Sequence, residues 1–342
     1  MNTITLYTIL EVMFALLLLF ASLVSAGHPA WEADATTIAP DWITIAPTAE
    51  FQTWPNTMIR FCFEDEESAK RLEEYIRAAM QLWYAAGLPE GFKFKEVSKS
   101  ACDRDPQNHL LVSGSDNDGA FWTSIGHNFE GDDGRPVMVL NFQDNYMEKY
   151  KPAMIAHEIG HAWGMEHQHQ DPMLWRWPRR GQPDLSLVIF NCQNVEGYNE
   201  LVKEYESPMM LYAHDGPCRS STAAHDKDFL AAEILPLETE NYYTPHRMWP
   251  WDSDVDWKSI MIYESHSFGA KDEHGYAKST LLRRMGRQVI EEPMVVTQDD
   301  VEGLMTLYNP KWGSLRVDLH NENNSPWFEI FKEKLKSCLR KH

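Results

Sequence analysis

Residues 157–167 read His-Glu-Ile-Gly-His-Ala-Trp-Gly-Met-Glu-His, which combines metal-binding side chains with one carboxylate at helical spacing. His157 and His161 are four residues apart, so on a helix they lie on one face and can bind one cation, with Glu158 facing its open side. A glycine at position 164 allows the chain to leave the helix and bring His167 back to the metal. Three histidines plus one water form the open, catalytic type of zinc site.

The alternative interpretation of this run is a helix that merely carries two histidines on its polar face. The full eleven-residue pattern is far rarer by chance than His-Glu-x-x-His alone, which favours the metal site. We therefore predict one Zn²⁺ per chain, with His157, His161 and His167 as ligands. A water bound to this zinc would be activated by Glu158 acting as general base. His169, which follows closely, is expected to support the site or to face solvent, and not to bind the metal.

A second motif, Ser259-Ile260-Met261-Ile262-Tyr263, follows about a hundred residues later. Together with the histidine run it resembles the metzincins, and its tyrosine two residues after the methionine resembles the astacin family. Weaker landmarks of that family occur in the expected order over residues 54–310. They are Trp54-Pro55-Asn56, Asn191, Asn194-Val195, Asp299 and Leu307-Tyr308.

The resemblance implies an α/β protein with a metzincin-type zincin fold. Such a fold has a twisted mixed β-sheet with two long helices in its upper half, and a largely irregular lower half that contains the Met-turn. In that family the hydroxyl equivalent to Tyr263 stabilises the oxyanion of the tetrahedral intermediate, and Met261 would form an apolar floor beneath the imidazoles. The resemblance thus implies a secreted zinc-dependent endopeptidase.

The sequence leaves open an adhesive or wall-associated protein whose histidines are incidental. Two further alternatives keep the zinc site. One is a metzincin protease outside the astacins, in which Tyr263 has no catalytic role. The other is a catalytically silent, zinc-containing extracellular binding protein, which the presence of Glu158 disfavours because a structural zinc site has no use for an unliganded carboxylate.

The chain departs from the astacin pattern at two places. Gln168 stands where astacins usually have a glutamate that receives the new N-terminal ammonium, so we expect activity not to depend on a defined mature N-terminus. Residues 206–251 form a longer segment than expected, which would reshape the substrate cleft. No specificity pocket can be assigned to any arginine, including Arg176, Arg179, Arg180 and Arg283.

The first residues of the chain predict that the protein is exported. A mostly apolar run from Val12 to Val24, followed by Ser25 and Ala26, predicts a signal peptide over residues 1–26. Because no Lys or Arg precedes this run, an uncleaved anchor is the alternative. We expect a leader or short propeptide over residues 27–52, a catalytic domain over 53–312 and a tail over 313–342 with an amphipathic helix.

The acidic composition of the chain limits the kinds of molecule that it can bind. The chain of 342 residues has 31 basic and 51 acidic side chains, a net charge of −20, which disfavours nucleic acid and anionic membranes. We expect protein or peptide substrates, no stable membrane association and a monomer. Five cysteines in a secreted chain predict two disulfides and one leftover thiol. The pairs expected are Cys62 with Cys102 and Cys192 with Cys218.

Periodicity predicts the elements that position the site. Alternation indicates a strand over residues 58–63, and further strands are expected over 92–97, 110–113 and 137–142. A helix that ends at Gly87 should bury Leu72, Ile76, Ala79, Met80 and Trp83. Pro152 suits the first turn of the metal-binding helix.

Overall fold

The computed structural model describes residues 41–47, 51–116, 121–128, 134–141, 148–177, 184–238, 242–245 and 250–309. All of these residues belong to one compact unit, residues 39–342. The predicted signal peptide, the C-terminal tail and most of the predicted leader lie outside the described residues. Within the described part of the chain, no helix has the length and apolar character needed to cross a membrane.

A five-stranded mixed sheet has the strand order β4-β3-β5-β8-β6. Strands β4, β3, β5 and β8 run parallel, and β6 is antiparallel to β8. The bounds are β3 Met58–Phe63, β4 Lys93–Glu96, β5 Leu110–Ser115, β6 Trp122–Thr123 and β8 Val137–Asn141. These strands confirm the four predicted from periodicity to within two residues at each end, except that Phe142 lies outside the described residues.

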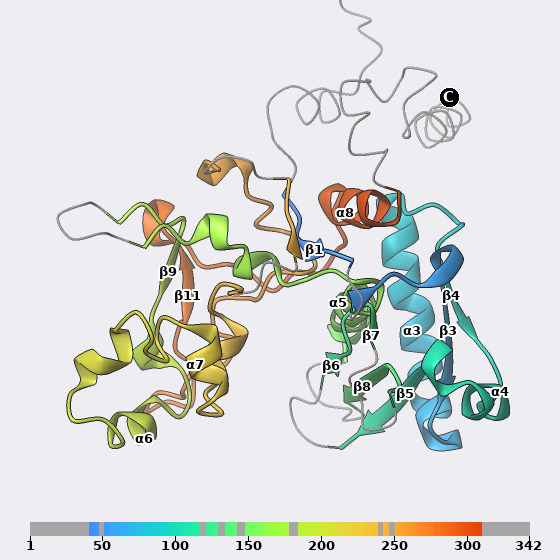
Figure 1. Ribbon diagram of the computed structural model, residues 1–342, viewed down its shortest axis with the longest axis horizontal. Helices are drawn as coiled ribbons and strands as arrows, with labels where there is room; N and C mark the ends of the chain where they lie inside the picture. Colours follow the sequence, from blue (N-terminus) through green and yellow to red (C-terminus); the bar gives the residue numbers. More distant parts are fainter. Residues whose placement is uncertain are drawn as a thin grey trace, which may run out of the picture. The chain divides into compact units, whose positions relative to one another are not determined.

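Two long helices contact each other beside this sheet (Figure 1). Helix α3 (Glu66–Ala86) begins where Asp65 accepts a hydrogen bond from the amide of Ser68, and ends at Gly87 in the left-handed region. Its buried face includes all five predicted core residues. Helix α5 (Lys151–Trp163) has Pro152 in its first turn, as predicted. The indole of Trp83 donates to the carbonyl of Ala156 at 3.0 Å and ties α3 to α5.

Gly160 lies where α5 packs against its neighbours most closely. A Cβ atom at this position would collide with the sulfur of Met261 and approach the Trp83 ring to 3.3 Å. Met261 and Trp83 are both fully buried, so neither side chain has free space to move into. The small residue at 160 therefore allows the methionine to contact the helix.

The second half of the described chain is largely irregular, as predicted, with a separate apolar cluster of its own. Its one strand pair among the described residues joins β9 (Val188–Phe190) to β11 (Leu281–Arg283) in antiparallel register. The short helices there are η3 Gln168–Gln170, η4 Pro172–Leu174, η5 Cys192–Asn194, α6 Tyr198–Val202, η6 Pro208–Tyr212, α7 Ser221–His225, η7 Leu230–Glu233, η8 Asp252–Asp254 and η9 Met285–Arg287. The predicted α/β fold class, with two long helices on a mixed sheet and an irregular second half, is confirmed.

The remaining short elements lie outside the main sheet. Strand β2 (Phe51–Gln52) pairs with β7 (His127–Asn128), and β1 (Thr44–Ile45) pairs with β10 (Tyr242–Tyr243). The others are η1 Pro55–Thr57, α4 Lys99–Arg104, η2 Pro106–Asn108 and α8 Gln298–Tyr308.

Both predicted disulfides are present. Cys62 of β3 is bonded to Cys102 of α4, and Cys192 of η5 is bonded to Cys218 ahead of α7. Each bond therefore stabilises one half of the described chain. Cys338, the predicted leftover thiol, lies outside the described residues.

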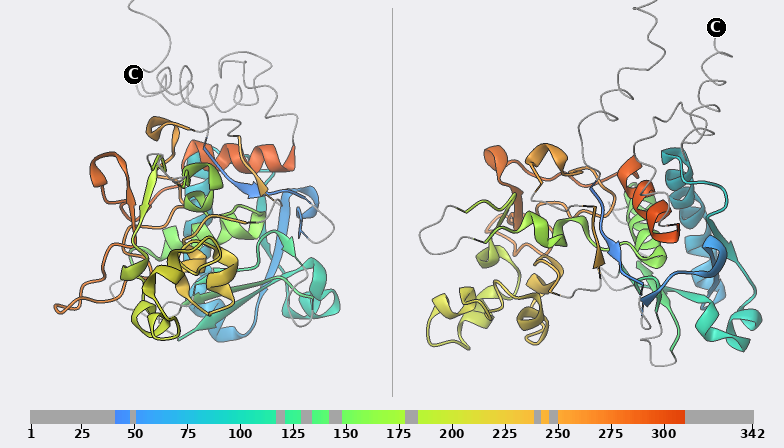
Figure 2. Two further views of the ribbon diagram at one scale, coloured as in Figure 1. Left: turned by 60° about the vertical axis from the view of Figure 1, so that its left-hand side comes forward. Right: turned by 45° about the horizontal axis from the view of Figure 1, so that its top comes forward.

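Residues 41–47 are packed into the protein. Trp42, Ile43 and Ile45 are buried, and β1 contacts α8 (Figure 2). The amide of Ile45 donates to the carbonyl of Gly164 at 2.9 Å, and the amide of Glu166 donates to the carbonyl of Ile43 at 3.0 Å. This stretch thus stabilises the turn after α5. The boundary between leader and catalytic domain at residue 53 stays a prediction.

Four aspartates connect this N-terminal stretch to α8. The Asp256 amide donates to Asp41, and the Asp41 amide donates to Asp299 at 3.1 Å. Asp300 accepts from the Ser259 hydroxyl at 2.5 Å and from the Ile260 amide at 2.9 Å. Burial, reinforced by Asp256, raises the pKa of both Asp299 and Asp300 to about 7.

The raised pKa values predict how stability changes with pH. A carboxyl whose pKa is higher in the folded than in the unfolded state stabilises the fold when protonated, and this stabilisation is lost as pH rises from about 4 through about 7. Asp299→Asn keeps an oxygen that can accept from Asp41 and stays neutral. We expect the variant to gain stability over the wild type at pH 8 and much less at pH 5, measured by urea unfolding. The exposed Asp215→Asn is the control, and an equal difference at both pH values for Asp299→Asn would contradict the prediction.

The packing at Gly160 leads to a second prediction. Gly160→Ala gains helix propensity worth about 1 kcal/mol, but overpacking a buried contact costs roughly 1–3 kcal/mol, so we expect a net loss of stability of up to about 2 kcal/mol. The control is Gly91→Ala, because Gly91 is exposed and its added carbon would meet one atom at 3.9 Å. The free energy of unfolding measures both variants. Equal stability of the Gly160 variant and the wild type would show that Met261 can move aside.

Candidate metal and active site

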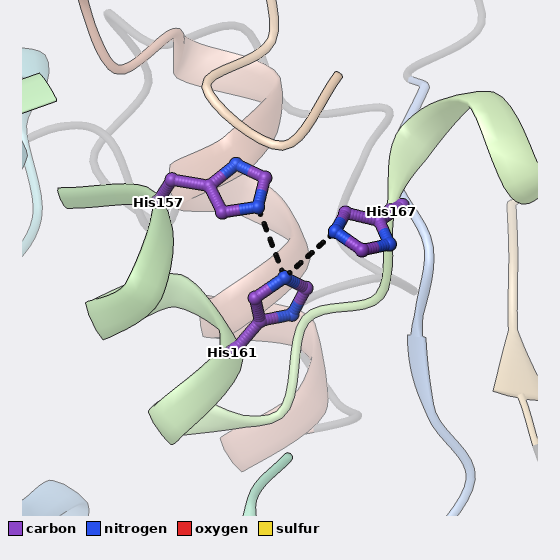
Figure 3. A group of neighbouring side chains, drawn as sticks. All are labelled: His157, His161 and His167. Carbon is purple, nitrogen blue, oxygen red and sulfur yellow. Dashed lines mark hydrogen bonds between the residues drawn. The ribbon is translucent and has the colours of Figure 1, made fainter. Parts of the chain in front are cut away.

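Three imidazole rings converge at the C-terminal half of α5 (Figure 3). His157 and His161 lie one helical turn apart on the same face of the helix, and His167 reaches them from the segment that follows. The Nε2 atom of His161 lies 3.0 Å from Nε2 of His157 and 3.0 Å from Nε2 of His167. The three residues predicted as ligands are therefore brought together.

The end of α5 explains how His167 arrives there. Gly164 has φ of 107°, a conformation that non-glycine residues rarely adopt, and its amide donates back to the carbonyls of Gly160 and His161. Other free carbonyls at this helix end also find donors. The Trp54 indole donates to Ala162 at 2.7 Å, and the Tyr308 hydroxyl donates to Trp163 at 3.1 Å. The chain therefore reverses without leaving these buried carbonyls unpaired.

The other nitrogen of each ring is held by an oxygen. Nδ1 of His157 lies 2.7 Å from the carbonyl of Ile260, and Nδ1 of His161 lies 2.8 Å from the carbonyl of Met165. Nδ1 of His167 lies 2.8 Å from the side-chain oxygen of Gln170. Because an oxygen acceptor requires a proton on its partner nitrogen, each neutral ring carries its proton on Nδ1 and a lone pair on Nε2.

The Nε2 lone pair of His161 faces the other two at 3.0 Å, and all three ligand atoms lie within 4.8 Å of one another, so the lone pairs repel unless a cation lies between them. Neutral imidazole nitrogens are preferred zinc ligands, and the nitrogens of a tetrahedral zinc site lie about 3.4 Å apart, so these residues fit Zn²⁺. Burial supports the same protonation state, because it lowers the pKa of His157 to about 4 and that of His161 to about 3. Among the described residues, this is the one group of potential ligands close enough to hold a metal ion.

Glu158 lies between the two helical histidines and is buried. Burial raises the pKa of its carboxyl to about 8, an effect that the Glu233 carboxylate increases and the Thr123 hydroxyl opposes. One of its oxygens, Oε2, makes no hydrogen bond within the described chain. A cation at the three histidines would lower this pKa and favour the carboxylate form. The residue thus has a free acceptor next to the place where a metal would bind.

The motif around Met261 is held against two of the histidine rings. The Asp300 side chain binds Ser259 and the amide of Ile260, and Ile260 in turn accepts from His157. The Tyr263 ring packs against the His167 ring at 4.3 Å between centroids. Burial raises the pKa of Tyr263 well above its usual value, and the nearby Glu233 and Glu158 add to the effect, so its hydroxyl keeps its proton at neutral pH.

His169 is not part of the ligand group and supports its surroundings, as predicted. Its Nδ1 accepts from the Tyr263 amide at 3.3 Å, and its Nε2 lies 2.9 Å from the carbonyl of Glu233. Its ring stacks on Tyr263 at 4.6 Å.

Sequence reasoning missed two residues of this region. Gln170 orients His167, and only its position three residues after that ligand hinted at a role. Glu233 lies in the long segment over residues 206–251 and carries no motif that could have identified it. Of the arginines left unassigned, Arg179 and Arg180 lie outside the described residues.

No protein-family model matches the sequence, and no curated protein matches it either. Among solved structures, it is similar to high choriolytic enzyme 1, a hatching enzyme zinc-protease from Oryzias latipes, the medaka fish, with 15% identity and a TM-score of 0.46. It is also similar to myroilysin, with 16% identity and a TM-score of 0.43. Each match covers 78% of this chain and 98% of the other. In its three histidines, its glycine turn, Met261 and Tyr263, the site itself resembles that of the astacin-type metzincins, as the sequence motifs predicted.

Proposed function

We propose that this protein is a zinc-dependent endopeptidase that hydrolyses peptide bonds in protein or peptide substrates. The observation that carries the proposal is the convergence of three Nε2 lone pairs whose rings are fixed through Nδ1 by oxygen acceptors. A zinc ion bound there supplies a Lewis acid that polarises a carbonyl and lowers the pKa of water.

The residues of the chain would share the remaining work. Glu158, with one unpaired carboxylate oxygen, takes a proton from the attacking water and returns it to the leaving amine. Tyr263, protonated and packed on His167, donates a hydrogen bond to the oxyanion of the tetrahedral intermediate. Met261 provides the apolar floor on which the imidazoles rest, in contact with α5 at Gly160.

We further propose that the protein works outside the cell as a monomer. The signal peptide over residues 1–26 and the leader over residues 27–52 are predictions from the sequence. Two disulfides support an oxidising compartment, because such bonds persist there. The fit of zinc and the activity can be tested together. Purified protein should contain about one zinc per chain and cleave unfolded casein, and o-phenanthroline should abolish the cleavage.

The first prediction from this proposal distinguishes the role of Glu158 as general base from the role of the three histidines as metal ligands. Glu158→Ala should retain about one zinc per chain, while peptide hydrolysis falls by roughly 100-fold or more because general base catalysis is lost. Metal analysis and a casein assay measure the two effects, and the exposed Glu148→Gln on the approach to α5 is the control. Wild-type activity in the Glu158 variant would contradict the mechanism, and loss of zinc would mean that the carboxylate helps to build the site.

The second prediction concerns Tyr263. If its hydroxyl acts mainly in the transition state, Tyr263→Phe should lower kcat by roughly 100-fold with little change in KM. The phenylalanine keeps the ring that packs against His167, so zinc content should stay the same. An unchanged kcat would favour a metzincin protease outside the astacins.

A further inference from the structure

The segment over residues 206–251 is bonded directly to the residues around the third histidine. The side-chain nitrogen of Gln170 donates to the carbonyl of Ala232 at 3.1 Å and to that of Leu235 at 2.9 Å. The side-chain oxygen of the same Gln170 accepts from His167. The Gln170 side chain thus connects helix η7 and the residue that follows Ile234 directly to the ring of His167.

A second link fixes Glu233 itself. His169 accepts from the Tyr263 amide through Nδ1, so its proton is on Nε2 and is donated to the carbonyl of Glu233 at 2.9 Å. The His169 ring stacks on Tyr263 and lies 5.2 Å from the His167 ring between centroids. Ile234 is fully buried and anchors the backbone on the C-terminal side. Residue 233 therefore has a defined position at the edge of the site.

Glu233 is exposed as a residue, unlike its neighbours Ala231 and Ile234. Its surroundings still remove enough water from its carboxyl to raise the pKa above the usual value. The side chain makes no hydrogen bond or ion pair with any residue in the described part of the chain. Its carboxylate is close enough to Glu158 and Tyr263 to raise the pKa of both groups. A carboxylate without a hydrogen-bond or ion-pair partner among the described residues thus lies within electrostatic reach of the proposed base and of Tyr263.

His225 acts electrostatically on the Glu233 carboxyl and lowers its pKa, but the two form no ion pair. Two arginines of the second half of the described chain are already paired. Arg283 is bound to Asp252 at 2.8 Å and covers the Trp257 ring, and Arg284 is bound to Asp184. Neither is free to receive an acidic side chain of a substrate. In a chain with a net charge of −20, the local field at the site also favours cations.

We infer that Glu233 forms a subsite for a basic side chain, lysine or arginine, on a substrate residue next to the scissile bond. The inference rests on the proposed peptidase function and names its substrate class. Glu233 would act as a specificity residue, because its carboxylate attracts the cation that binds beside the zinc and repels an acidic side chain at the same place.

Paired peptides test the subsite in the zinc-loaded full chain. Quenched fluorescent peptides would be identical except for Lys, Arg, Ala or Glu at one of the four positions around the cleaved bond. At one position we expect kcat/KM for the Lys or Arg peptide to exceed that for the Ala peptide by about tenfold, the equivalent of about 1.4 kcal/mol. The Glu peptide should be cleaved more slowly than the Ala peptide.

Substitution of Glu233 should change this ratio. Glu233→Gln should bring the Lys-to-Ala ratio close to one, and Glu233→Lys should make the Glu peptide preferred. The ratio cancels any effect that the substitution has on the chemical step common to both peptides. Glu206→Gln, an exposed glutamate in the same segment, is the control and should keep the wild-type ratio.

Binding gives a readout that is independent of catalysis. In the zinc-loaded Glu158→Ala background, fluorescence anisotropy should give a Kd about tenfold lower for the Lys peptide than for the Ala peptide, and Glu233→Gln should remove the difference. Cleavage by the wild type with a ratio that Glu233→Gln leaves unchanged would overturn the inference and leave the peptidase proposal intact. A wild type without zinc-dependent cleavage of any peptide would overturn both.

Discussion

The position of three ring protons is the constraint on which the site depends. Each Nδ1–H is directed to an oxygen, so all three Nε2 lone pairs face one point. The acceptors come from different parts of the chain: the Ile260 carbonyl, the Met165 carbonyl and the Gln170 side chain. A metal site of this kind is therefore built by the groups that orient the ligands as much as by the ligands.

Much of the surrounding structure serves to place these acceptors. Asp300, at the start of α8, holds Ser259 and Ile260, and Ile260 in turn binds His157. Residues 41–47 bind both sides of the turn that contains Met165. The cost is a set of buried carboxyls with raised pKa values near α8. Burial of these carboxyls, which raises their pKa, is thus tolerated because Asp300 positions the methionine-containing turn.

The sequence predicted those features that depend on local spacing. The histidine run determines its own geometry, because a helix followed by Gly164 leaves few paths for the chain, and the apolar spacing from Leu72 to Trp83 defined α3. The contacts of Glu233 with His169 and of Asp41 with Asp299 were not predictable, since 64 and 258 residues separate the partners. Such contacts depend on tertiary packing of irregular segments, which have no period to detect. The packing of Trp42, Ile43 and Ile45 was missed for the same reason, because residues 27–52, which are rich in Ala, Thr and Pro, show no period and indicated only a leader or short propeptide.

The orientation of the Gln170 amide determines which nitrogen of His167 carries the proton. An amide group has one end that accepts and one that donates, and here both hydrogens of the donating end are taken by the carbonyls of Ala232 and Leu235. The accepting end is left for His167, which must then keep its proton on the far side from the metal. Rotation of this amide by half a turn would break both bonds to the segment and push the proton of His167 toward the zinc. The fold of an irregular loop thus dictates the tautomer of a metal ligand, and any relative that replaces this loop needs another way to hold that proton.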